Sequence, residues 1–270
     1  MLPLLVEYGA RFGFWNHDGF MPHFHLYTQP IDFQIPILRV LRSLNVPPPT
    51  DSKGRTPLWD IARARLPMED FQKRIDVLRD SGLRINTTDK SGASPLHLAC
   101  KGPWPTSRFT RKQESLFVER LLDLGLNVNL ADNEGTTALH LAALIALLDT
   151  IKLLVQKFEA DVNFPDSKGN TPLHFAAADF SAFEKYQAEM RREREECVEL
   201  LLKAGANVHA RNNLAQTPSD MIRAKDLKDE KRALLKILKS AERSLRLEQV
   251  SSEDMSDGSS EHKRKKQKIE

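Results

Sequence analysis

The sequence predicts an all-α protein in which one helix–turn–helix unit is repeated along most of the chain. Three observations support this class. A short motif that joins a turn to a helix start recurs, amphipathic helices that end at glycine follow it, and the composition changes near residue 248 to serine and acidic residues. We therefore expect one elongated helical array, followed by a disordered tail.

Each residue type in the clearest copy of the motif, residues 166–177, has a mechanical reason. Gly169 suits a tight turn, because glycine adopts positive φ without steric cost. Thr171 can cap a helix start with its hydroxyl, and Pro172 suits the first helical position, where its missing N–H costs nothing. Leu173 and the alanines after it give the short helix one apolar side, against which a second helix can lie closely.

The copies of this motif divide the chain into units. Successive copies are separated by 38, 43, 34 and 46 residues, measured between positions that align with Thr171. A unit of two helices cannot bury its apolar side alone, so neighbouring units must stack. The aligned positions are Thr56, Ser94, Thr137, Thr171 and Thr217.

The run Thr171-Pro172-Leu173-His174 resembles the signature of the ankyrin repeat, and the copies at Ser94 and Thr137 share it. The resemblance implies a helical solenoid with short β-hairpin tips that binds other proteins. We expect this solenoid to cover residues 1–247, with a partial repeat at 1–15 and units near 16–50, 51–88, 89–131, 132–165, 166–211 and 212–247. Residues 248–270 form the expected disordered tail.

The sequence departs from the family pattern in three ways. Trp59 stands where the family carries a histidine that helps to tie neighbouring hairpins together, so that tie is in doubt. Extra residues at 66–70, 102–110 and 181–196 separate the two helices of three units and build up one edge of the array. The chain also begins inside a repeat, which fits either a shortened chain or an end that contacts a second copy or a partner.

Individual helices are also expected. The most apolar pair should lie at 138–148 and 149–158, with surplus leucine and isoleucine packed against neighbouring elements rather than exposed. The charged segment 184–195 should lengthen the next second helix toward its N-terminus, because it is rich in strong helix formers. A helix over 229–246 should close the array.

Charge and composition exclude several classes of function. The net charge is +3, but residues 263–268 hold five basic residues, so the rest of the chain has 35 basic against 37 acidic residues, a balance of −2. A near-neutral body argues against direct nucleic-acid binding. No apolar run is long enough to cross a membrane. Cys100 and Cys197 form no metal-type pair and suggest a reducing compartment, and Cys100 takes the place of a small core alanine.

No enzyme is expected. The sequence lacks a glycine-rich phosphate loop, a zinc-protease motif and a serine-hydrolase motif. Three histidines recur with the repeat and are expected to be structural, and the spacing of three others near the start does not enforce metal ligation. We expect no catalytic residue, no cofactor and no metal. The two sets are His97, His140 and His174, and His17, His23 and His25.

The expected function is that of a protein-binding scaffold or adaptor. The alternative is a substrate-recognition arm of a larger ubiquitin-ligase adaptor or ankyrin-containing enzyme. Basic residues on the hairpin tips and first helices are expected to form one concave rim for an acidic protein partner, with two tryptophans as apolar anchors. These residues are Lys53, Arg55, Trp59, Arg63, Lys90, Lys101, Trp104 and Lys168.

The end of the chain resembles a short nuclear import signal. We therefore expect binding to an import receptor and location in the nucleus, with the cytoplasm as a second location. The basic residues of this run are Lys263, Arg264, Lys265, Lys266 and Lys268.

Overall fold

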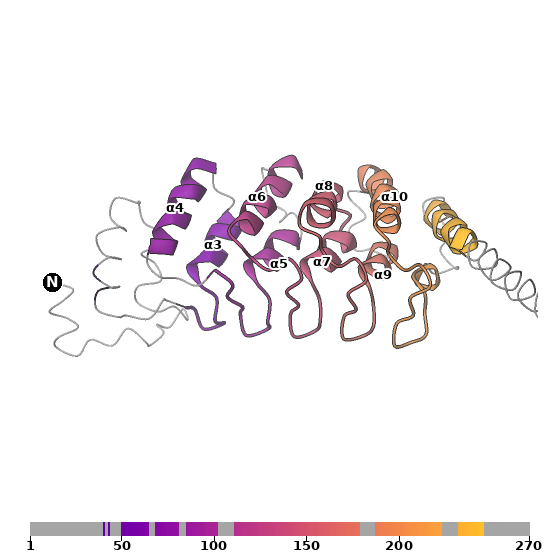
Figure 1. Ribbon diagram of the computed structural model, residues 1–270, viewed down its shortest axis with the longest axis horizontal. Helices are drawn as coiled ribbons and strands as arrows, with labels where there is room; N and C mark the ends of the chain where they lie inside the picture. The colour runs from indigo at the N-terminus through magenta and orange to yellow at the C-terminus, as the bar shows by residue number, and fades with distance from the viewer. Residues whose placement is uncertain are drawn as a thin grey trace, which may run out of the picture. The chain divides into compact units, whose positions relative to one another are not determined.

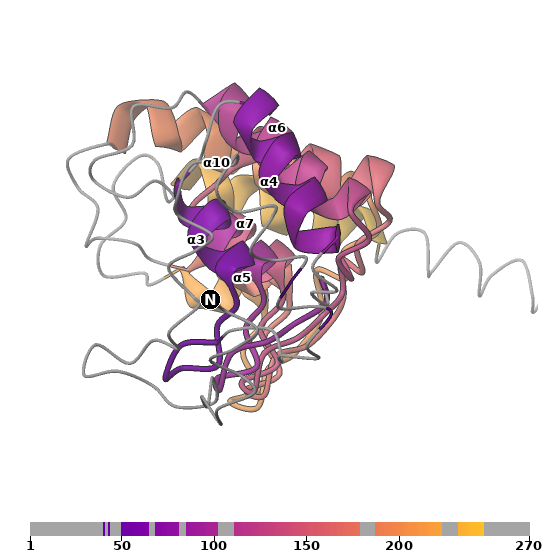
Figure 2. The same ribbon diagram turned by 90° about the vertical axis from the view of Figure 1, so that its left-hand side faces the viewer.

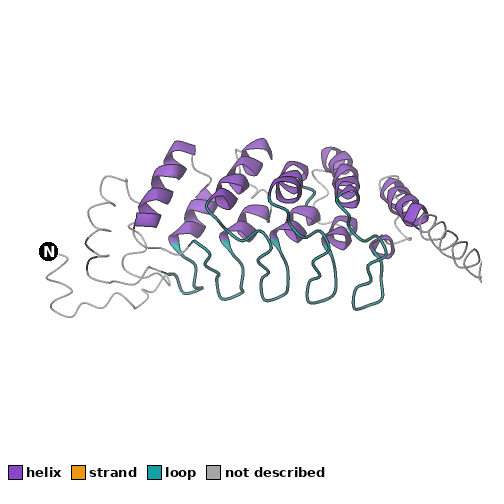
Figure 3. Cartoon of the chain, viewed as in Figure 1, coloured by secondary structure: helices purple, strands orange, loops and turns teal. Residues whose placement is uncertain are grey.

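The computed structural model describes residues 40, 43, 50–64, 68–80, 85–101, 111–178, 187–222 and 232–245. Helices dominate these residues (Figures 1 and 3), which confirms the predicted all-α repeat class. The expected β-hairpin tips are turns rather than strands, and the antiparallel bridge between Ala131 and Thr137 is isolated. Backbone packing divides the chain into two units, Met1–Asp161 and Val162–Glu270.

The described part of the first unit contains three helix pairs in two layers. The helices that follow the tips are α3 (Pro57–Ala64), α5 (Pro95–Cys100) and α7 (Ala138–Leu144); their partners are α4 (Met68–Asp80), α6 (Arg111–Asp123) and α8 (Leu148–Lys152), which continues into the π-helical turn η2 (Leu153–Lys157). Helix α5 contacts both α3 and α7, and α6 contacts α8, so helices of the same layer pack side by side (Figures 1 and 2).

The second unit continues the same pattern with one regular pair and one shortened pair. Helix α9 (Pro172–Ala177) packs on α10 (Gln187–Lys203). The 3-10 turn η4 (Pro218–Met221) packs against α9, and a further helix covers residues 232–245. The described part of α10 confirms that charged residues lengthen this second helix toward its N-terminus.

The first helices begin where the motif predicts. The residue before α5, Ser94, has extended φ and ψ of −108° and 168°, and Thr171 before α9 has −87° and 167°. Both helices have proline at their first position, where no N–H is needed. The cap residues themselves are buried, at 2% and 5% exposure.

The motif leucines form the centre of the core in each unit. Leu58, Leu96 and Leu139 are 1% exposed in the first unit, and Leu173 is 0% exposed in the second. Among the second helices, Phe71 of α4 meets Phe117 of α6 edge to face, with ring centroids 5.1 Å apart. Cys100 and Cys197 are fully buried, and the burial of Cys100 is that expected of a thiol in place of a core alanine.

The apolar pair at 138–158 differs in detail from the expectation. The helix predicted over 138–148 ends at Leu144, and Ala146 takes a positive φ of 55° in the turn that follows. Ile145 and Leu147 flank Ala146 and are 9% and 5% exposed, so the surplus apolar residues do pack inward. The helix ends here because the turn places both side chains in the core. A continued helix would point them to different sides.

Several expectations lie outside the described residues. They are the partial repeat at 1–15, the three N-terminal histidines, the insertion 102–110 and the tail 248–270. The expected closing helix is described at residues 232–245, with Leu234 and Leu238 6% and 0% exposed.

Candidate partner-binding surface

The repeat tips are rigid turns, each organised by one side chain. In the tip at 89–93, Asp89 Oδ1 accepts hydrogen bonds from the backbone N–H of Ser91 at 2.8 Å and of Ala93 at 3.2 Å. The tips that begin at Asp51, Asp132, Asp166 and Asn212 repeat this pair of bonds, with donor–acceptor distances from 2.7 to 3.0 Å. The exposed residues at the third position of each tip therefore stand on a fixed backbone.

Consecutive tips within a unit are joined by backbone bonds. In the first unit, the N–H of Lys90 donates to the carbonyl of Lys53 at 2.8 Å, and the N–H of Asn133 donates to that of Ser91 at 2.9 Å. In the second unit, the N–H of Asn213 donates to the carbonyl of Lys168 at 2.8 Å. The tips therefore form a bonded row in each unit.

The predicted lysines occupy these tips, although not at equivalent positions. Lys53 and Lys168 are third in their tips, whereas Lys90 is second, since Ser91 takes the third place. All three lysines are exposed. The structure brings Lys53 and Lys90 onto adjacent tips of the first unit, and Lys168 lies on a tip of the second.

Arg55 is paired within its own tip. Its Nε donates to Asp51 Oδ2 at 2.7 Å, and its Nη2 forms a salt bridge with the same oxygen. Asp51 is 3% exposed, so Arg55 neutralises a buried carboxylate that also organises the tip. The charge of Arg55 is therefore partly used within the tip, and its contact with a partner stays a prediction.

The expectation that Trp59 acts as an apolar anchor for a partner is corrected. Its side chain is 6% exposed and lies in the core of the first unit, so it offers no apolar anchor at the surface. Lys101 is exposed just after α5. Arg63 belongs to the last turn of α3, and Trp104 lies outside the described residues.

The histidines that recur with the repeat form hydrogen bonds from one repeat to the next, which we call ties. The N–H of Ser94 donates to His97 Nδ1 at 3.1 Å, and His97 Nε2 lies 2.9 Å from the carbonyl oxygen of Thr136 in the following tip. Because a backbone N–H only donates and a carbonyl only accepts, the ring must be neutral with its proton on Nε2. His174 repeats the arrangement, with Thr171 at 3.1 Å and the carbonyl of Gln216 at 3.0 Å.

Burial explains the acid–base behaviour of these rings. Desolvation lowers the pKa of His97 below its ordinary value, against the opposing effect of the Thr136 carbonyl and the carboxylates of Asp132 and Asp89. Desolvation likewise lowers the pKa of His174, against the Gln216 carbonyl. Both imidazoles are therefore committed to structural hydrogen bonds in their neutral form.

Two repeats in the described part of the chain lack the histidine, and the structure shows different consequences. Trp59 confirms that the tie is missing there, since its indole Nε1 is buried and has no hydrogen-bond partner among the described residues. Asp220 keeps only the bonds to the cap residue of its own helix. Its Oδ2 accepts hydrogen bonds from the Thr217 N–H at 2.9 Å and from the Thr217 hydroxyl at 2.8 Å. These bonds lower the pKa of Asp220.

Sequence reasoning missed a second set of ties, made by asparagines in the loops after the second helices. The side-chain amide of Asn163 donates to the Gly205 carbonyl at 2.9 Å, while its Oδ1 accepts from the N–H of Asn207 at 2.7 Å. Asn86 bonds Gly125 and Asn127 in the same way. The signal that could have identified them is the recurrence of Asn three residues before the aspartate of the next tip, at 86, 129 and 163.

The surface also contains a mixed-charge groove between α6 and the helix α8–η2. Leu116, 40% exposed, lies in it beside Glu119, Lys152 and Lys157. Lys157 Nζ pairs with Glu119 at 2.7 Å and with Asp123 at 3.3 Å, so its charge is used within the groove.

No cluster of metal-ligating side chains occurs among the described residues. None of the described helices combines the length and the hydrophobicity that crossing a bilayer requires. The candidate surface is therefore the row of tips in each unit.

Comparison with known proteins gives one family match. Residues 110–212 match the family model of ankyrin repeats, in three copies. No curated protein matches the chain. This match supports an ankyrin repeat protein, and the tips and helical elements described before and after the matched span continue the same pattern.

Proposed function

We propose that the protein is a nuclear adaptor that binds an acidic segment of a partner through the tips of its repeats. Ankyrin repeats mediate protein–protein binding, and the finer proposal rests on the tip lysines. The observation that carries it is the bond between the Lys90 N–H and the Lys53 carbonyl, which holds two exposed lysines on adjacent rigid turns.

The electrostatics of the tips favour an acidic partner. The carboxylate of Asp51 accepts backbone N–H groups inside its own turn, is buried and pairs with Arg55, so it does not present a free negative charge beside Lys53. Cations fixed on a rigid frame raise the local potential and speed encounter with an acidic surface. Lys168 would act in the same way from the second unit.

We further propose that the chain acts by binding and not by catalysis. The groups most suited to acid–base or nucleophilic chemistry serve the fold, since His97 and His174 make ties between repeats and Cys100 and Cys197 are buried. Nuclear location is proposed from the five basic residues within 263–268.

The test of the tip surface is a matched pair of triple charge reversals. One variant carries Lys53→Glu, Lys90→Glu and Lys168→Glu; the control carries Lys73→Glu, Lys152→Glu and Lys203→Glu, which change the net charge equally at exposed positions away from the tips. Affinity capture from nuclear and cytoplasmic extracts, read by mass spectrometry, compares both with the parent protein.

We expect the tip variant to lose the acidic proteins that the parent and the control retain. The tip variant should keep the unfolding free energy of the parent to within about 0.5 kcal/mol, as exposed substitutions usually do. The control should fold but lose more stability, because Lys73→Glu and Lys203→Glu place like charges beside Glu69 and Glu199. An identical partner list for the two variants would exclude the tips as the binding surface.

A further inference from the structure

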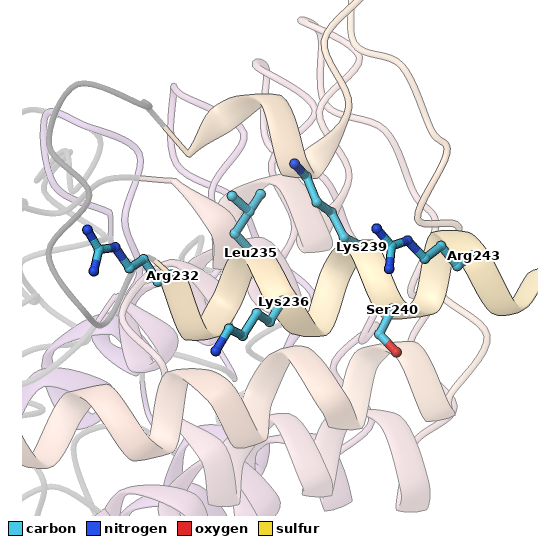
Figure 4. A pocket seen from close by; sticks show the side chains of 6 residues that line it. All are labelled: Arg232, Leu235, Lys236, Lys239, Ser240 and Arg243. Carbon is cyan, nitrogen blue, oxygen red and sulfur yellow. The ribbon is translucent and has the colours of Figure 1, made fainter.

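The helix at residues 232–245 presents a row of cations along one side, which we call the cationic row. It consists of Arg232, Lys236, Lys239 and Arg243, all exposed (Figure 4). At 3.6 residues per turn these positions fall within an arc of about 60° and extend over about 16 Å of helix. Leu234 and Leu238 lie on the opposite side and are buried.

Three cations of this row, Lys236, Lys239 and Arg243, are not neutralised by acidic side chains of the described residues. The one acid of residues 232–245 is Glu242, whose Oε1 accepts a hydrogen bond from the Ser219 hydroxyl at 2.6 Å. Among the described residues, no carboxylate forms a salt bridge with Lys236, Lys239 or Arg243. Helix α10 of the same unit differs, because it mixes acids with bases and pairs Glu199 with Lys203 at 3.7 Å.

The row also borders a shallow depression that suits a peptide backbone. The cations line it together with Leu235, which is partly exposed, and Ser240, which is exposed (Figure 4). A segment that binds here must therefore supply several negative charges to the row and small side chains beside Leu235 and Ser240.

We propose that the acidic segment at residues 248–261 of the same chain docks on the cationic row. The segment contains five acids, Glu248, Glu253, Asp254, Asp257 and Glu261, and no basic residue. Its other residues are mostly small, with serines at five positions. Charge and side-chain size both match the depression.

The position of the segment in the chain favours this occupant over a separate protein. The segment starts three residues after the helix residues end at 245. A tether this short gives an effective concentration of the order of millimolar. An extended chain rises about 3.3–3.6 Å per residue, so about five residues span the row, and residues 246–252 are enough to reverse direction.

Docking would have a consequence for the residues that follow. The basic run 263–268 directly succeeds the acidic segment and would otherwise be its nearest electrostatic partner. With the acids held on the cationic row, the basic run is left to bind elsewhere. Phosphorylation of the interleaved serines would add about −1.5 to −2 charges each and tighten the contact.

The experiment uses the full chain with a spin label on an introduced cysteine, Ser256→Cys. The native Cys100 and Cys197 are 0% exposed and should not react under mild labelling. Paramagnetic broadening of backbone amide signals then reports which residues approach the segment. We expect broadening of residues 232–245 at low salt, and loss of it at 1 M salt, where the Debye length is about 3 Å.

Charge exchange distinguishes this contact from a general attraction. Lys236→Glu with Lys239→Glu should abolish the broadening, and adding Glu253→Lys with Asp254→Lys should restore it. The matched control Lys203→Glu, on the same unit but away from the row, should leave it unchanged. If the reversed helix fails to fold, the salt dependence of the parent decides the question.

Three results would overturn the proposal. One is the absence of broadening at low salt, and another is its persistence in the Lys236→Glu, Lys239→Glu variant when that variant is folded. The third is broadening seen only between labelled and unlabelled molecules in a mixture, which would assign the row to a second copy. Signals of 232–245 that respond to a single-stranded oligonucleotide, with no broadening from the label, would make it a nucleic-acid surface instead.

Discussion

The imidazole of His97 bonds the carbonyl of Thr136, 39 residues further along the chain, at 2.9 Å. One side chain thus caps its own helix through Nδ1 and holds the next tip through Nε2. The bond uses a carbonyl that already accepts the N–H of Asp132 within its own tip. Helix start, turn and neighbouring repeat are therefore stabilised together by a residue that the motif places at every regular repeat.

Stability should fall as the pH decreases below about 6.5. The pKa values of His97 and His174 are lowered in the folded protein, so below the ordinary value of about 6.5 the unfolded chain binds more protons than the folded one. The stabilisation from these residues is present above that pH and is lost as the pH falls toward the folded pKa values. Each contributes a slope of at most about 1.4 kcal/mol per pH unit. Denaturant unfolding between pH 5 and 8 measures it.

The control for this effect is His97→Gln with His174→Gln. Glutamine can accept the bond from the cap residue, as in a capping box, but it does not titrate. We expect a loss of about 1–2 kcal/mol per site at pH 7.5 from the broken bond to the next tip, and a flatter pH profile. An unchanged slope would assign the pH dependence to other groups.

Two glycines with similar backbone angles should respond differently to alanine. Gly92 and Gly125 have φ of 78° and 91°, so either substitution costs about 1 kcal/mol in backbone strain. A Cβ on Gly92 would lie 2.5 Å from the side-chain oxygen and 2.8 Å from the backbone nitrogen of Asn133 in the next tip, whereas one on Gly125 meets nothing within 4 Å.

Gly92→Ala should therefore destabilise the first unit by at least about 2 kcal/mol, and Gly125→Ala by about 1 kcal/mol. Chemical denaturation of the two variants checks the difference. Equal losses of unfolding free energy would show that neighbouring tips move apart easily to make room for the Cβ. In the last described tip, Ala215 takes the place of this glycine and adopts a φ of 57°, so alanine can adopt the required backbone angle.

The asparagine ties should be sensitive to the amide as well as to size. Asn163→Ala removes a donor and an acceptor at an exposed site and should cost about 1 kcal/mol. Asn163→Asp keeps the acceptor for Asn207 but turns an oxygen toward the Gly205 carbonyl. We expect Asp to recover no more than half of the loss. Full recovery in thermal unfolding would mean that the Gly205 bond contributes little.

Nuclear import should depend on the basic run and not on the repeats. Replacing Lys263, Arg264, Lys265 and Lys266 with alanine should move a fluorescent fusion to the cytoplasm and leave the melting curve unchanged. The triple tip variant serves as the control, since it changes charge but should not alter location. A fusion that stays nuclear without the basic run would contradict the import signal.

Much of the fold was predictable because the repeat motif determines it locally. Thr171, Pro172 and Leu173 each favour one place at a helix start, and repetition of the motif confirms the assignment. The end of α7 was not predictable in the same way. Ala138–Leu148 reads as one apolar helix, and only packing makes Ile145 and Leu147 more favourable in a turn than on the helix surface.

The candidate surface was harder to predict, because the exposure of a residue depends on its neighbours in space. Lys53 and Arg55 are both basic residues of one tip, yet Arg55 pairs with the buried Asp51. Tryptophan is a residue type that often anchors binding, but Trp59 occupies a core position of the motif. The motif gives the frame of the repeat, and residues that depart from it need the structure to be placed.

The missing tie at Trp59 sets the order in which the first unit should come apart. Where His97 couples its repeat to the next, the repeat that begins at Asp51 relies on the Lys90 N–H bond, on a hydroxyl contact of 3.3 Å between Thr56 and Thr87, and on apolar packing. In a linear array each junction contributes separately, so the weakest one opens first. Native-state hydrogen exchange should then release the amides of α3 at a lower opening free energy than those of α7. A pulling force applied along the array would find its first yield point at this tryptophan.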